Sequence, residues 1–79
     1  MSTAMHAILC QGGFEIEPAY GRDYKSKAEV MAAWNANKDF TITATGQTIS
    51  KSCAEEYGLK GKTVYVRYKK RREILPVKV

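Results

Sequence analysis

The sequence of 79 residues contains few of several informative residue types, with two cysteines, two prolines and one histidine. Cys10 and Cys53 cannot build the disulfide framework of a small secreted domain, so we expect both thiols to be reduced. No apolar run is long enough to cross a membrane, and the opening residues lack the basic start and apolar core of a signal peptide. The sequence therefore predicts a cytoplasmic protein with no membrane partner.

Side chains that bind metals or activate nucleophiles are equally scarce. His6, Cys10 and Cys53 include no CxxC or HxxxH pair, so we predict no metal site and no cofactor. Residues 58–63 resemble the end of a phosphate-binding P-loop, but Glu56 replaces the required first glycine and a strand pattern follows. Cys53 has no base near it in the sequence, so packing in the core is expected. We predict a protein that is not an enzyme, and keep an enzyme based on Cys53 as a third alternative.

Acidic residues are scarce in the second half of the chain. Residues 1–40 carry four Lys/Arg and five Asp/Glu, whereas residues 41–79 carry nine Lys/Arg and three Asp/Glu. The formal charge of +5 therefore arises entirely after residue 40. A basic surface of this kind suits a polyanion, because phosphate contacts supply most of the non-specific affinity for nucleic acid. Solubility alone is the alternative explanation of this charge.

Hydrophobic periodicity and turn residues predict one small α+β domain over residues 1–79. Residues 5–17 read as a β-hairpin around Gly12-Gly13 that sets Leu9 opposite Ile16, and Pro18 stops it. A capping box predicts a helix over residues 27–36, with Trp34 as a core anchor. Its ends are set by Ser26, Glu29 and a left-handed Asn37, and a strand over residues 40–45 follows it.

A second capping box, Ser52 with Glu55, predicts a short helix from Cys53 to about Tyr57. Gly58 fits the left-handed position after it, with Leu59 folding back. Two C-terminal strands are expected over residues 63–68 and 73–79, the latter on an edge because it contains Pro76. The predicted fold is an antiparallel-rich sheet with the long helix packed on one face. Its exposed edges would permit a homodimer by strand pairing.

The strand over residues 63–68 and the basic run after it form the main candidate site. Alternation places Val64, Val66 and Tyr68 on one face of the strand and Tyr65 and Arg67 on the other. If the strand continues, Lys69 and Arg71 extend the second face. Cations beside an aromatic ring are the ingredients of single-stranded nucleic-acid binding. We therefore predict a nucleic-acid-binding surface made of Tyr65, Arg67, Lys69, Lys70, Arg71 and Arg72.

A different function is also consistent with these residues. The basic run would equally meet an acidic protein surface, or simply blunt an exposed sheet edge. Tyr20, Arg22 and Tyr24 surround a glycine turn and would provide anchors for a protein partner. The alternative prediction is thus a protein-binding module that inhibits or modulates a host protein complex.

Three segments carry a resemblance to a group of known proteins. Residues 21–26 (GRDYKS), 33–40 (AWNANKDF) and 61–68 (GKTVYVRY) resemble small orphan proteins encoded by bacteriophages and prophages. The resemblance brings no established activity with it. It implies an accessory factor that binds nucleic acid or a host protein in the host cytoplasm, sometimes in host takeover or against host defence. The basic charge differs from that of acidic DNA mimics.

Overall fold

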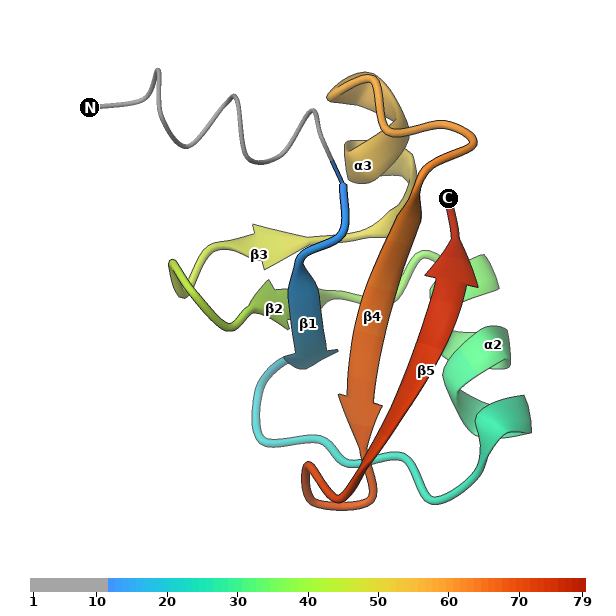
Figure 1. Ribbon diagram of the computed structural model, residues 1–79. Coiled ribbons are helices and arrows are strands. Elements are labelled where there is room, and N and C mark those ends of the chain that lie inside the picture. Colours follow the sequence, from blue (N-terminus) through green and yellow to red (C-terminus); the bar gives the residue numbers. More distant parts are fainter. Residues whose placement is uncertain (1–11) are drawn as a thin grey trace.

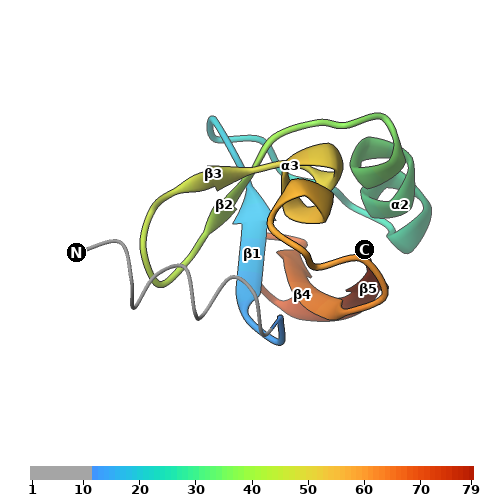
Figure 2. The ribbon, with the colours of Figure 1, turned by 90° about the horizontal axis from the view of Figure 1, so that it is seen from above.

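The computed structural model describes residues 12–79 as a five-stranded sheet with two helices on one of its faces (Figure 1). The strands are β1 (Glu15–Pro18), β2 (Phe40–Ile42), β3 (Thr48–Ile49), β4 (Thr63–Tyr68) and β5 (Glu73–Lys78), and the helices are α2 (Lys27–Asn35) and α3 (Lys51–Glu56). Seen from above, the sheet curves around both helices (Figure 2). The predicted small α+β fold is confirmed.

The strand order is β3-β2-β1-β4-β5, which places β1 at the centre of the sheet. Strand β1 pairs antiparallel with β2 and parallel with β4, and the other two pairings are antiparallel. Ile16 accordingly lies opposite Ile42 on one side and Val66 on the other. The first strand of the predicted hairpin, with Leu9, lies outside the described residues. Its turn glycines Gly12 and Gly13 both have positive φ angles.

Helix α2 begins and ends close to where its capping residues predict. The Ser26 hydroxyl accepts a hydrogen bond from the Glu29 amide at 3.2 Å. The Glu29 carboxylate accepts from the Lys25 amide at 2.6 Å, and not from Ser26 as a full capping box requires. Asn37 has the predicted left-handed conformation, with φ of 63°. These ends orient the buried face of the helix, which includes Trp34, towards the sheet.

The middle of the chain differs from the prediction in two places. The strand expected over residues 40–45 ends at Ile42, because residues 43–46 turn and the Gly46 amide donates to the Ile42 carbonyl at 2.7 Å. Strand β3, which the sequence analysis missed, follows this turn. Helix α3 is capped by Ser50 and not by Ser52, so Cys53 lies in the first turn rather than at its first position.

The end of α3 follows the predicted pattern. Gly58 has φ of 87°, and the Leu59 amide donates to the Ala54 carbonyl at 3.1 Å. Leu59 is thereby buried against the core. Strand β4 then alternates as predicted, with Val64, Val66 and Tyr68 buried and Tyr65 exposed.

The core lies between the helices and the concave face of the sheet. Strand β5 adds Val77 to this core and is an edge strand, as Pro76 predicts. The opposite, convex face of the sheet carries the polar side chains of β1 and β4. The largest fully buried side chains are Trp34, Tyr68, Phe40, Ile16, Ile42, Ile49, Leu59, Val30, Val64, Val66 and Val77.

Candidate functional site

Residues 69–72, which we call the basic turn, connect β4 to β5 in an unusual backbone conformation. Lys69, Lys70 and Arg71 have φ angles of 54°, 54° and 69°. The left-handed backbone conformation costs an L-residue roughly 1 kcal/mol or more of conformational free energy, and consecutive residues seldom adopt it. Strand β4 therefore ends at Tyr68, as expected, so the condition under which Lys69 and Arg71 would extend the face of Arg67 is not met.

The basic turn is held in place by a loop that lies about 45 residues earlier in the chain. The Lys69 amide donates to the Tyr24 carbonyl and the Lys70 amide to Asp23 Oδ1, both at 2.9 Å. We call residues 19–25 the facing loop. Backbone strain persists only where the surroundings impose it, and it is concentrated at functional sites. The strained turn is thus a structural reason to look for function at this end of the molecule.

Two of the predicted cations face the protein's own carboxylates. Arg67 Nε donates to Glu15 Oε2 at 2.6 Å. Arg71 forms an ion pair with Glu17, and its Nη2 lies 3.9 Å from Glu15 Oε1. Arg67 Nη1 also donates to the Arg71 carbonyl at 3.0 Å. The charges of these two predicted site residues are therefore partly neutralised within the molecule.

Lys69 is paired as well. Its Nζ lies 3.3 Å from Glu73 Oε2, and the Tyr68 hydroxyl donates to Glu73 Oε1 at 3.0 Å. The hydrogen bond from Tyr68, followed by the hydrogen bond and charge of Lys69, lowers the pKa of Glu73. Desolvation, and then the contact with Glu73, raises the pKa of Tyr68. Glu73 therefore stays ionised, and Lys69 contributes less free charge than the sequence suggests.

Lys70 and Arg72 differ from the other three cations. Within residues 12–79 neither side chain forms an ion pair, and both residues are exposed. Together with Lys25, Lys69 and Asp23 they line a shallow hollow of about 380 Å³. Four cations and one carboxylate line this hollow, so it favours an anion.

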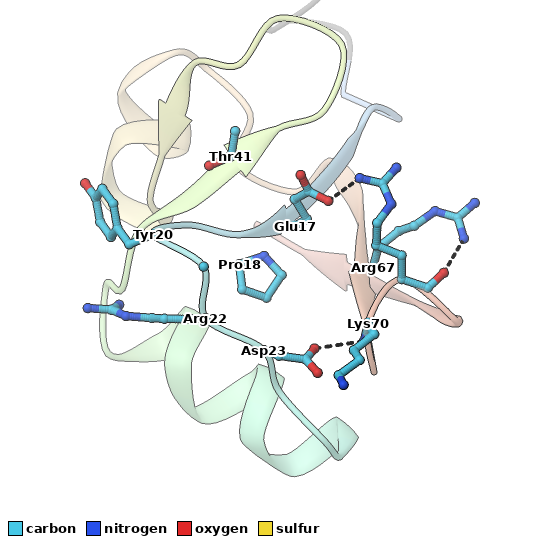
Figure 3. Close-up of a pocket in the computed structure, with 10 residues that line it drawn as sticks. Glu17, Pro18, Tyr20, Arg22, Asp23, Thr41, Arg67 and Lys70 are labelled. Atoms are coloured by element: carbon cyan, nitrogen blue, oxygen red, sulfur yellow. Dashed lines mark hydrogen bonds and ion pairs between the residues drawn. The ribbon is translucent and has the colours of Figure 1, made fainter.

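A second hollow, the cleft, is lined by residues of the basic turn, the facing loop and the neighbouring strands (Figure 3). Its volume is about 430 Å³. The cleft brings together Arg67, Lys70 and Arg71 from the predicted nucleic-acid surface with Tyr20 and Arg22 from the alternative protein-binding set. Its lining is completed by Glu17, Pro18, Gly21, Asp23 and Thr41.

The three tyrosines of the two predicted sites have different environments. The Tyr20 ring is 70% exposed, has the Arg22 guanidinium carbon 5.5 Å from its centroid, and donates from its hydroxyl to Asp39 at 2.8 Å. That hydrogen bond, with the charge of Asp39, raises the pKa of Tyr20. Tyr24 is partly buried against the core, with its ring centroid 5.9 Å from that of Phe40, so less of its surface is open to a partner than that of Tyr20. Tyr65 is 39% exposed on the convex face and does not line the cleft.

The described residues contain no group of three or more His, Cys, Asp or Glu side chains able to hold a metal ion. His6 and Cys10 lie outside that range, and Cys53 packs at the edge of the core. Lys62 and Thr63 lead into β4 and not into the helix that a P-loop requires. No helix within residues 12–79 is long and apolar enough to cross a membrane.

Comparisons of the chain with protein-family models, curated proteins and solved structures find no match.

The strain of the basic turn leads to a testable prediction about stability. Lys70→Gly removes the Cβ from a residue with φ of 54°, so we expect the free energy of unfolding to rise by about 0.5–1 kcal/mol after the entropic cost of glycine. Lys70→Ala removes the same charge but keeps the Cβ, so it serves as the matched control and should be nearly neutral. Urea denaturation measures both. Equal stability of the two variants would show that the turn is not strained at Lys70.

Proposed function

We propose that the protein is a non-enzymatic accessory protein that binds nucleic acid through the end of the molecule formed by the basic turn and the facing loop. The observation that carries the proposal is the convergence of cations from two distant segments. Seven cations line the two hollows, and four carboxylates line them or pair with these cations, which leaves a net charge of +3. The cations are Arg22, Lys25, Arg67, Lys69, Lys70, Arg71 and Arg72, and the carboxylates are Glu15, Glu17, Asp23 and Glu73.

The cations of this end differ in how readily they meet a phosphate. Lys70 and Arg72 have no competing ion pair among the described residues and would bind phosphate oxygens directly. Arg67 and Arg71 already form hydrogen bonds to carboxylates, so a phosphate would have to displace Glu15 or Glu17. The primary contacts are therefore assigned to Lys70 and Arg72, with the neighbouring Lys25 in support.

The proposal is tested by fluorescence anisotropy with a labelled single-stranded oligonucleotide and the double variant Lys70→Ala/Arg72→Ala. Each lost phosphate contact lowers affinity about fourfold at about 0.15 M salt, since the salt slope per contact is about 0.7 for single strands. For two contacts we expect about fifteenfold weaker binding and a salt slope smaller by about 1.4.

The matched control is Lys60→Ala/Lys62→Ala, which makes the same change in net charge before β4, at the opposite end of that strand. Both of these lysines are exposed. Their removal should alter binding less than about threefold, because only distant charge is lost. Absence of binding by the unmodified protein, or equal losses in the two double variants, would contradict the proposal.

A second function, modulation of a host protein complex, is supported by the high exposure of the Tyr20 ring beside Arg22. An acidic protein surface would then occupy the same end of the molecule. Under either function, the resemblance to phage-encoded proteins supports a setting in the host cytoplasm. A pull-down from bacterial lysate, repeated after nuclease treatment, separates the two functions. A partner that survives nuclease and is lost in Tyr20→Ala would favour the protein-binding function.

A further inference from the structure

The cleft has an arrangement of groups that a uniformly basic surface lacks. In Figure 3, the Pro18 ring lies between Tyr20 and Arg22 on one side and Arg67 and Lys70 on the other. An apolar floor thus separates an aromatic end from a cationic end. The volume of about 430 Å³ falls within the range of sites that bind small molecules, which is about 300–1,000 Å³.

The aromatic end of the cleft, formed by Tyr20 and Arg22, is suited to a flat ligand. The Tyr20 hydroxyl is fixed by Asp39 and the Arg22 guanidinium lies over the ring, so both planar groups are restrained while the ring remains 70% exposed. A nucleobase stacks on a tyrosine ring and equally on an arginine guanidinium. An unstacked base would therefore find a platform here without a large loss of side-chain freedom.

The cationic end and the walls supply the remaining contacts. Lys70 lines the cleft where the basic turn closes it, and its side chain forms no ion pair within residues 12–79, so it suits the phosphate of the same nucleotide. Asp23 accepts the Lys70 amide through Oδ1, which leaves Oδ2 to accept an N–H group of a base. The cleft therefore offers separate groups for an aromatic ring, for its N–H donors and for an anion.

From these contacts we infer that the cleft binds one unstacked nucleotide of single-stranded nucleic acid, with Tyr20 and Arg22 against the base and Lys70 at the phosphate. The inference rests on the proposed nucleic-acid function and narrows it. In a duplex both faces of each base are covered by its neighbours, so a duplex can use only the phosphate contacts. The protein should consequently prefer single strands.

Anisotropy measurements with a single-stranded oligonucleotide and with the duplex of the same length and sequence test this inference. We expect Tyr20→Leu to weaken single-strand binding about tenfold and to leave duplex binding within about twofold, because stacking is lost while phosphate contacts remain. Tyr20→Phe keeps the ring and should stay within about threefold of the unmodified protein. Tyr65→Leu, which removes the exposed aromatic ring outside the cleft, is the matched control and should have little effect on either ligand.

The outcomes separate this inference from the proposed function. If single strand and duplex bind equally well and Tyr20→Leu changes neither, the inference is overturned while the proposed function stands. If Tyr65→Leu causes the loss instead, the base stacks on the convex face and the inference is again overturned. If neither nucleic acid binds, both the inference and the proposed function are wrong.

Discussion

Replacing Trp34 with alanine is expected to lower the free energy of unfolding by about 3–5 kcal/mol, the cost of removing a large buried aromatic side chain. Trp34 is only 1% exposed, and its ring packs edge-on against Phe40 with centroids 5.6 Å apart. A domain of this size has a total stability of roughly 4–12 kcal/mol. The substitution should therefore leave the protein largely unfolded or close to it at 37 °C.

Urea denaturation followed by circular dichroism measures this loss, with Met31→Ala as the matched control. Met31 lies on the same helix and is 37% exposed, so its truncation should cost less than about 1 kcal/mol. Trp34→Phe should cost less than Trp34→Ala. It keeps an aromatic ring and removes an indole N–H that is buried without a hydrogen-bond partner among residues 12–79. Similar losses for Met31→Ala and Trp34→Ala would contradict the placement of Trp34 in the core.

The double variant Glu15→Gln/Glu17→Gln is expected to bind single-stranded nucleic acid about fifteenfold more tightly than the unmodified protein. These two carboxylates hold Arg67 and Arg71 in the free protein. Neutralising them leaves both guanidinium groups available for phosphate. Two additional contacts correspond to about fourfold each at about 0.15 M salt, and to a salt slope steeper by about 1.4.

The matched control for this prediction is Glu55→Gln/Glu56→Gln, which raises the net charge by the same amount on exposed positions of α3. A general effect of net charge would strengthen binding equally in both double variants. A larger gain in affinity for Glu15→Gln/Glu17→Gln than for the control is expected only if Arg67 and Arg71 are specifically released from their ion pairs. An unchanged affinity for Glu15→Gln/Glu17→Gln would show that the two arginines do not reach the nucleic acid.

Features determined by neighbouring residues were predictable from the sequence. The alternation of β4, the cap at Ser26 and the left-handed residues Asn37 and Gly58 each depend on interactions within about five residues. The start of helix α3 could not be predicted in this way. Ser50 and Ser52 are both suitable N-caps. Ser50 is the one used because β3 ends at Ile49 and the helix begins directly after Ser50.

The candidate site was only partly predictable, because its geometry depends on contacts between distant residues. The sequence indicated the cations of the basic turn, but not the carboxylates that neutralise some of them. Glu15 and Glu17 reach Arg67 and Arg71 because β1 lies parallel to β4. That pairing joins segments about 50 residues apart, and hydrophobic periodicity does not identify the partners of a strand. The outward alternation of Glu15 and Glu17 was the one local sign of their position.

The central position of β1 also affects how the protein is made. Glu15 pairs with Tyr65, so the middle of the sheet is completed only by a strand about 50 residues further along the chain. Pairings that distant are slow to form because a long loop must close first. A ribosome must therefore release the chain as far as β4 before the centre of the native sheet assembles, and chains shortened before β4 should be degraded rather than fold.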